Sequence, residues 1–355
     1  MKELTIIVAQ VNPLVGDIQG NTQLVLDTVA RAGAEAGPTI VVFPELTLTA
    51  YPPEDLLLRP SLELRIEGAL RRLCRELPSH VHVLLGYPRM TEAGLCNVAA
   101  LLHGGQIVSE YAKRFLPNYK VFDEKRYFVP GSDYGAINIG GIPVALTVCE
   151  DIWHPGPMLE AKEEGACLML NINASPFHLD KRPIRIDNVR RRVAEGAMPV
   201  VYINQVGGQD ELVFDGGSFA AGANGEVAVA APNYEECEYW LTADFGGSGD
   251  VQLAGSGVAA PLDELEATWR ALVLGVRDYV DKNRFPGVVL GLSGGIDSAL
   301  TLAVAVEALG AERVEAVMMP FRYTSQMSVE DAAEQSRLLG VSHKVISIEP
   351  IYDSF

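Results

Sequence analysis

A glycine-rich segment near residue 290 places the strongest restriction on how this chain can fold. The apolar run GVVLGLS, residues 287–293, predicts a buried strand, and DSALTLAVAVEALG, residues 297–310, predicts a helix. The backbone N–H groups of a turn between a strand and a helix form a site for anions. Gly294 and Gly295 let the backbone approach phosphate oxygens, while Ser293 and Ser298 add hydroxyl donors. The segment therefore predicts a phosphate-binding loop in an α/β protein.

The loop differs from the two commonest nucleotide-binding motifs, because its spacing fits neither GxxxxGK[ST] nor GxGxxG. A plain strand–helix turn would not explain Asp297, which repels phosphate unless a metal ion or a contact on the adenine side justifies it. We take eight consecutive residues as candidates for nucleotide contacts: Gly291, Leu292, Ser293, Gly294, Gly295, Ile296, Asp297 and Ser298.

The rest of the chain alternates short β-branched runs with amphipathic helical patterns, which favours an α/β fold. A helix over 21–37 is expected, with Asn21 as its N-cap and Gly37 as its end. Hairpins are expected to turn at Gly104–Gly105 and Asn224–Gly225. Buried strands are predicted at 4–10, 39–45, 81–88, 142–153, 166–175 and 198–208.

The domain boundary is predicted where the pattern loosens. Residues 231–257 are acidic and glycine-rich, and a long helix is expected over 261–285. We therefore predict a first domain at 1–250, a linker at 251–260 and a second domain at 261–355.

Composition limits the class of protein. A formal net charge of −18 excludes a protein that coats nucleic acid, although a local site can still bind an anionic substrate. The five cysteines form no CxxC pair, the opening residues are too short for a signal peptide, and no apolar run is long enough to span a membrane. These features predict a cytoplasmic protein with reduced thiols and no membrane or nucleic-acid partner.

Reactive side chains stand at the ends of three predicted strands: Glu45, Lys113 and Cys149. Taken singly, each is ordinary, because a buried cysteine is usually inert and a lone Lys or Glu is usually a solvated charge. Together they supply a nucleophile, a carboxylate that can take its proton and an ammonium that can stabilise an oxyanion. Such a set attacks an amide or nitrile carbon through a thioester.

The sequences around these residues resemble the nitrilase, or carbon–nitrogen hydrolase, superfamily over about residues 1–250. LPNY.VFDEKRYF, CEDIW, NASPFH..K and VGGQDELVFDGGSF are similar to the glutaminase domain of glutamine-dependent NAD synthetases. The resemblance implies an α-β-β-α sandwich with Cys149 as nucleophile, Glu45 as base and Lys113 as oxyanion stabiliser. It also implies an auxiliary Glu124 that orients Lys113. The residues implied to bind glutamine are Tyr119, Ser175, Lys181 and Arg182; Lys120 departs from the expected smaller residue.

The loop SGGIDS resembles the pyrophosphate loop of ATP pyrophosphatases, and MPFRYTSQMSVEDA resembles a segment of NAD synthetases. This implies the first part of a doubly wound parallel sheet that binds ATP, with contributions from Met319 and Arg322. ATP and Mg²⁺ would activate deamido-NAD without a prosthetic group, and the chain would form a homo-oligomer. The resemblance stops partway through this domain, so we expect a fragment of a longer enzyme.

Two other functions stay open from the residues. One is a nitrilase-type amidase that feeds a different ATP pyrophosphatase reaction, and the other is a non-catalytic glutamine or nucleotide sensor. The presence of Glu45, Lys113 and Cys149 together weighs against the sensor.

Overall fold

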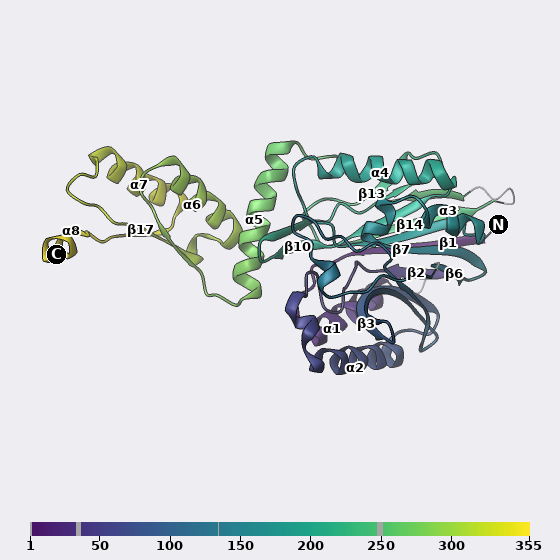
Figure 1. Ribbon diagram of the computed structural model, residues 1–355. Helices are drawn as coiled ribbons and strands as arrows, with labels where there is room; N and C mark the ends of the chain where they lie inside the picture. The colour runs from purple at the N-terminus through teal and green to yellow at the C-terminus, as the bar shows by residue number, and fades with distance from the viewer. Residues whose placement is uncertain (1, 33–36, 134, 247–250) are drawn as a thin grey trace. The chain divides into compact units, whose positions relative to one another are not determined.

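The computed structural model describes residues 2–32, 37–133, 135–246 and 251–355 (Figure 1). Two compact units are formed. The first contains residues 1–207 and 214–262, and the second contains residues 208–213 and 263–355. Among the described residues, no helix is both long and apolar enough to cross a membrane.

The first unit contains two large sheets. One has the strand order β15-β14-β1-β2-β3-β4-β5, and the other has the order β13-β12-β9-β8-β7-β6. The strands of the first sheet are β1 (Lys2–Gln10), β2 (Thr39–Val42), β3 (Val81–Thr91), β4 (Gly94–His103), β5 (Gln106–Ala112), β14 (Cys237–Phe245) and β15 (Val251–Gly255). Those of the second are β6 (Ala136–Ile139), β7 (Ile142–Val148), β8 (Leu168–Asn173), β9 (Val200–Asn204), β12 (Phe219–Ala221) and β13 (Val227–Ala230).

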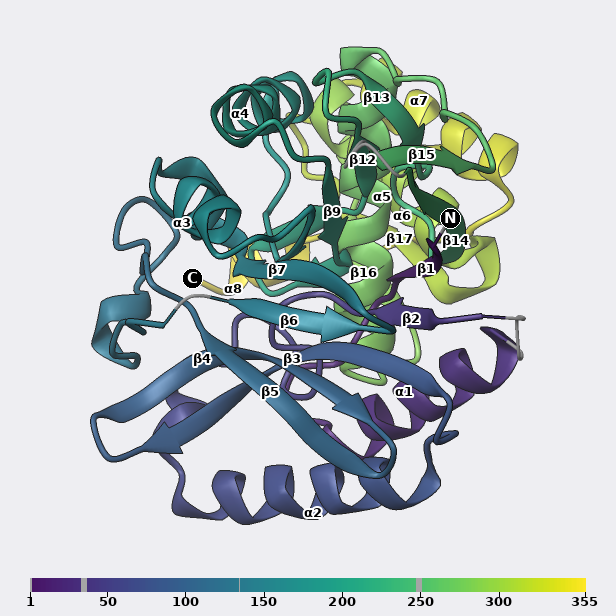
Figure 2. The same cartoon turned by 90° about the vertical axis from the view of Figure 1, so that its right-hand side faces the viewer.

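The sheets pack face to face, and helices cover their outer faces (Figure 2). Leu4 and Ile6 of β1 share one buried cluster with Leu168 and Leu170 of β8, so apolar side chains of both sheets form the central core. A second buried cluster lies between the first sheet and α1 (Ile18–Ala32) and α2 (Pro60–Glu76). A third joins the second sheet to α3 (Pro157–Glu163) and α4 (Lys181–Gly196). The predicted α-β-β-α sandwich is confirmed.

The predicted linker is wrong. Residues 251–255 form β15, which pairs with β14, and β14 pairs along its whole length with β1. Leu241 and Ala243 of β14 point into the central core, whereas Trp240 packs on the helix side of the sheet. The acidic and glycine-rich composition of 231–257 concealed this alternation, which is the pattern of a strand.

The predicted cap of the first helix is also wrong. α1 begins at Ile18, so Asn21 lies inside it. The Asn21 side chain accepts a hydrogen bond from the Leu14 N–H and donates to the carbonyls of Leu14 and Leu48. It therefore ties two loops together instead of capping the helix. Gly37 lies beyond residues 33–36, which are outside the described residues. Both predicted hairpins are confirmed, between β4 and β5 and between β12 and β13.

The second unit holds a parallel sheet, as predicted, with the strand order β16-β17-β18. Asp263 caps α5 by accepting a hydrogen bond from the Glu266 N–H. Residues of α5 and α6 form a buried cluster with those of the sheet. The elements are α5 (Glu264–Lys282), β16 (Val288–Gly291), α6 (Ile296–Leu309), η4 (Ala311–Arg313), β17 (Val314–Met318), α7 (Gln326–Leu339), β18 (Ser342–Val345) and α8 (Glu349–Ser354).

Candidate active sites

Glu45 lies in the turn after β2, and three donors hold its carboxylate. Its Oε1 accepts hydrogen bonds from Lys113 Nζ at 2.8 Å and from Asn97 Nδ2 at 2.7 Å. Its Oε2 accepts one from the Ala174 N–H at 3.0 Å. The turn packs tightly on β3, where a Cβ at Gly86 would lie 2.2 Å from the nitrogen of Leu46. The carboxylate is fully buried and its orientation is fixed from three strands.

Lys113 follows β5 and lies between two carboxylates. Its Nζ is 2.8 Å from Glu45 Oε1 and 2.7 Å from Glu124 Oε1, and the lysine side chain is fully buried. Burial alone would lower the pKa of Lys113, but the charges of Glu124 and Glu45 raise it well above its ordinary value. The lysine therefore stays an ammonium. Burial raises the pKa of Glu124 to about 7, although Lys113 opposes the change and Glu45 adds to it.

Cys149 is the first residue of η3 (Cys149–Trp153), a short turn that follows β7. Its φ of +44° lies in the left-handed region, which non-glycine residues adopt at a cost in strain of about 1–3 kcal/mol. Burial raises the pKa of the thiol well above its ordinary value, Glu45 raises it further and Lys113 lowers it. Both charges thus act on the thiol, which is protonated at neutral pH and needs a base before it can attack.

Asp151 holds this turn against the segment that carries Lys113. Its Oδ2 accepts hydrogen bonds from the Val148 N–H and the Tyr111 hydroxyl, at 3.0 and 2.8 Å. Its Oδ1 accepts from the N–H groups of Arg114 and Phe115, at 3.0 and 2.9 Å. One buried carboxylate therefore links the chain on either side of the nucleophile to the residues directly after the lysine.

Of the four residues predicted to bind glutamine, Tyr119 and Lys181 contact the η3 turn that begins with Cys149, Ser175 follows the residue that binds Glu45, and Arg182 contacts a different loop. Tyr119 donates a hydrogen bond to Glu150, and Lys181 Nζ lies 4.5 Å from the centre of the Trp153 ring. Burial raises the pKa of Tyr119 and lowers the pKa of Lys181, and Cys149 has a smaller effect on each. Ser175 is buried at the end of β8, next to the Ala174 N–H that binds Glu45. Arg182 instead donates to Asn233 Oδ1.

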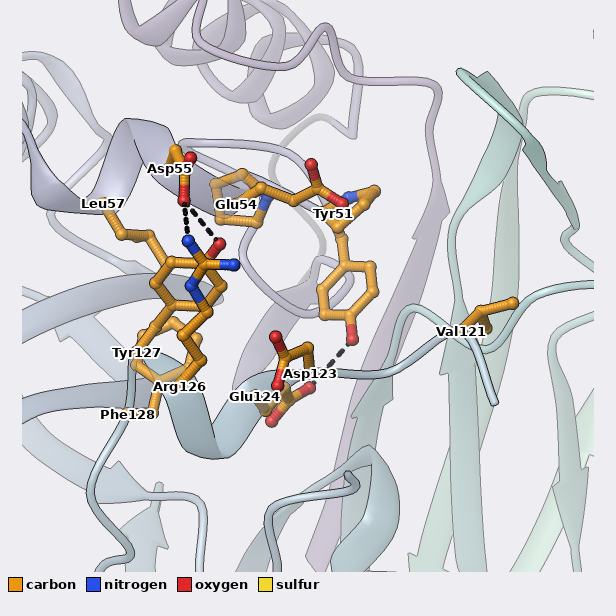
Figure 3. Close-up of a pocket in the computed structure, with 12 residues that line it drawn as sticks. Tyr51, Glu54, Asp55, Leu57, Val121, Asp123, Glu124, Arg126, Tyr127 and Phe128 are labelled. Carbon is orange, nitrogen blue, oxygen red and sulfur yellow. Dashed lines mark hydrogen bonds and ion pairs between the residues drawn. The ribbon is translucent and has the colours of Figure 1, made fainter. Parts of the chain in front are cut away.

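A cavity of about 170 Å³ reaches the Glu124 end of this ion-pair network (Figure 3). Tyr51 lies in its wall and donates a hydrogen bond to Glu124 Oε1 at 3.0 Å. On the other side of the cavity, Asp55 binds the guanidinium of Arg126 and the hydroxyl of Tyr127. A small molecule in this cavity would meet Glu124 before it met Lys113.

The predicted phosphate loop joins β16 to α6. Ser298 Oγ lies 3.1 Å from Ser293 Oγ and accepts a hydrogen bond from the Ser293 N–H. Gly294 has a φ of +80°, and a Cβ there would lie 2.2 Å from the Ser328 carbonyl oxygen, so only glycine fits. Asp297 lies in the first turn of α6, and Met319 lies against Gly291. The loop therefore has the strand–loop–helix form that the sequence predicted.

Two of the candidate nucleotide residues point elsewhere. The Leu292 side chain is buried in the core, and its N–H donates to the Val317 carbonyl, which leaves neither group for a ligand. The guanidinium of Arg322 forms ion pairs with Glu349 and Asp353. In this structure Leu292 therefore contributes to the core of the unit, and Arg322 pairs with two acids near the end of the chain.

Sequence comparison gives the chain a family. Residues 5–244 match the family model for carbon-nitrogen hydrolase, and residues 268–355 match that for NAD synthase. The glutamine-dependent NAD(+) synthetase of Acinetobacter baylyi is 41% identical over 356 residues, which cover 100% of this chain and 65% of that protein. The enzyme of the same name from Thermotoga maritima is 39% identical over 387 residues, covering 100% of this chain and 67% of that protein. The chain belongs to the glutamine-dependent NAD(+) synthetase family.

A solved structure supports the same relationship. The glutamine-dependent NAD+ synthetase from Acinetobacter baumannii, in complex with ADP, has a TM-score of 0.93 and 40% identity to this chain. That match covers 100% of this chain and 66% of the other. The chain thus spans about two thirds of the length of the synthetases that it matches.

Proposed function

We propose that the first unit hydrolyses glutamine to glutamate and ammonia, and that the whole protein passes this ammonia to ATP-activated deamido-NAD. The products would be NAD, AMP and pyrophosphate. The observation that supports the proposal most strongly is the buried contact of Lys113 with Glu45 and Glu124, beside a strained Cys149 whose thiol needs a base.

In the first half-reaction, the Cys149 thiol attacks the side-chain amide carbon of glutamine while Glu45 accepts the thiol proton. Lys113 donates hydrogen bonds to the oxyanion of the tetrahedral intermediate, and Glu124 holds that ammonium in place. Glu45 then gives its proton to the departing nitrogen, which leaves as ammonia with formation of a thioester. Water, deprotonated by Glu45, cleaves the thioester to glutamate and restores the thiol.

Glutamine carries an ammonium and a carboxylate on its α-carbon, so its site needs groups of both signs. Lys181 supplies a positive charge on the Cys149 side of α4, and the Tyr119 hydroxyl and Ser175 supply polar contacts nearby. We include Arg182 as a more distant contributor, because its guanidinium binds Asn233.

In the second half-reaction, ATP would bind at Gly291 and residues 293–298 with Met319 beside the loop, and the N-terminus of α6 would face its phosphates. Mg²⁺ would bind to the ATP phosphates, which are ligands that this ion commonly uses in nucleotide sites. ATP adenylates the nicotinate carboxylate with release of pyrophosphate, and ammonia then displaces AMP. The proposal uses no prosthetic group and places the enzyme in the cytoplasm as a homo-oligomer.

Incubation of the protein with glutamine tests the first half-reaction. We expect glutamate and ammonia in equal amounts, and no product from Cys149→Ala. Turnover of acetamide but not of glutamine would favour a simple amidase, and glutamine binding without turnover of either amide would favour a sensor. Supplying ATP, Mg²⁺, deamido-NAD and ammonium to the full-length protein tests the second half-reaction.

A further inference from the structure

Arg185 is a buried cation on α4 that binds the loop carrying Ser175. Only 2% of its surface is exposed. Its Nη2 donates to the carbonyls of Ser175 and Pro176, at 2.6 and 3.1 Å, and its Nε donates to Ser175 Oγ at 3.2 Å. Its Nη1 is 2.9 Å from both carboxylate oxygens of Asp215. All three nitrogens are therefore bound to protein groups, so Arg185 would act on a ligand through the groups that it holds, of which Ser175 is a proposed glutamine-binding residue.

Asp215, the last residue of β11 (Leu212–Asp215), connects Arg185 to Asn233 and Arg182. The Asp215 carboxylate also accepts a hydrogen bond from Asn233 Nδ2 at 3.2 Å, and Asn233 Oδ1 accepts one from Arg182. Arg182 and Arg185 thus attach to the same carboxylate network from one helix. Lys181 differs from both, because its ammonium lies on the Trp153 ring. Burial, and then the charge of Arg185, lower the pKa of Lys181, while Cys149 and Glu150 raise it.

The position of the Ser175 hydroxyl depends on Arg185 more than the position of the Ser175 backbone does. Asn204 accepts the Ser175 N–H at 2.8 Å and donates to the Ser175 carbonyl at 3.2 Å, so the backbone has a second support. The Oγ atom receives a hydrogen bond from Arg185 Nε, and the Ser175 side chain also interacts with the hydroxyl of Tyr202, which lies on β9. A planar guanidinium fixes the carbonyl and hydroxyl oxygens together, whereas the single ammonium of a lysine cannot.

We propose that Arg185 is a positioning residue for substrate recognition, which sets the direction of the Ser175 hydroxyl and the path of residues 175–176, directly after the Ala174 N–H that binds Glu45. The inference rests on the proposed glutaminase activity. It predicts that loss of the guanidinium weakens glutamine binding while the triad continues to work.

Arg185→Lys tests the positioning role directly. The lysine keeps a positive charge beside Asp215 but lacks the planar guanidinium that binds both the carbonyl and the hydroxyl of Ser175. We expect the KM for glutamine to rise about 10- to 100-fold and kcat to change by less than about threefold, because hydrogen bonds to charged groups are the strong ones. Alkylation of Cys149 by iodoacetamide, a small reagent that does not need the glutamine site, should keep the wild-type rate.

Arg192→Gln is the matched control. Arg192 lies on the same helix and is 7% exposed, but it donates to Glu195, and its Nε and Nη1 have no hydrogen-bond partner among the described residues. Its replacement should leave KM unchanged. If Arg185→Lys does not fold, Asp215→Asn can be tested in its place. This change weakens the ion pair that holds Arg185 but leaves Ser175 itself unchanged, so it should raise the KM for glutamine to a smaller degree.

A folded Arg185→Lys protein with the wild-type KM would overturn the inference. It would also be overturned if KM rose while kcat and the alkylation rate fell by a similar factor, because that result indicates a purely structural role. A wild-type protein that does not hydrolyse glutamine would instead contradict the proposed function.

Discussion

Replacement of Lys113 by Met removes the ammonium that contacts both Glu45 and Glu124. Methionine has a similar length and no charge, so the change leaves the packing nearly intact. Glu45 and Glu124 contact the same nitrogen, and their oxygens therefore lie no more than about 5.5 Å apart. At that separation and an effective dielectric constant of ~20, two negative charges repel by about 3 kcal/mol. Glu124, whose pKa is already about 7, should then keep a proton at neutral pH.

The catalytic loss comes from a different contact. In the proposed mechanism Lys113 donates to the oxyanion, and removal of one such donor costs about 3–4 kcal/mol, or ~10²–10³ in kcat. Protonation of Glu124 prevents the repulsion from unfolding the site, so the protein should remain folded and still bind glutamine. The expected result is therefore a large fall in kcat with a small change in KM.

Steady-state release of glutamate, measured beside unfolding by denaturant, checks both parts. Lys162→Met serves as the control, because Lys162 is an exposed lysine on α3 and its replacement should leave kcat unchanged. A folded Lys113→Met protein that keeps kcat within about threefold of wild type would refute the role of Lys113 in stabilising the oxyanion.

Four further predictions follow from the same sites. A glutamine-like diazo-ketone should label Cys149 and leave the other four cysteines unmodified, and peptide mapping that finds the label elsewhere would remove Cys149 as nucleophile. Glu45→Gln should lower kcat far more than it raises KM, because the thiol keeps its proton; a normal kcat would show another base. The pKa of Glu124 lies above its ordinary 4.5, so the folded state binds the proton more tightly than the unfolded state does. The free energy of unfolding should therefore fall by up to about 3 kcal/mol as pH rises from 4.5 to 7. Denaturant titrations should show this fall for the wild-type protein but not for Glu124→Gln. Gly294→Ala should weaken ATP binding in a calorimetric titration, whereas Gly340→Ala, also at positive φ but with nothing within 4 Å, should not.

The strands and the loop after β16 could be predicted from sequence because their signals are local. An apolar run bounded by glycines or polar residues predicts a strand, and each proposed triad residue follows such a run. The assignment of roles to Glu45, Lys113 and Cys149 depended on the resemblance of whole motifs to a family, since each residue alone is ordinary.

Other parts of the site depend on contacts between distant segments. Asn97 lies in the middle of an apolar strand and contacts Glu45 only because β4 pairs with β3. Arg185 is one of several arginines on a polar helix, and no local pattern separates it from Arg192. The linker was misplaced for a related reason. β14 is stabilised by pairing with β1, which is more than 200 residues earlier in the sequence.

Trapping of the acyl-enzyme with hydroxylamine tests the central claim most directly. A glutamyl thioester on Cys149 is divided between water and hydroxylamine, so the wild-type protein incubated with glutamine and hydroxylamine should form γ-glutamyl hydroxamate at the expense of glutamate. Cys149→Ala should form neither product. Release of glutamate without hydroxamate, or by Cys149→Ala, would contradict the thioester mechanism.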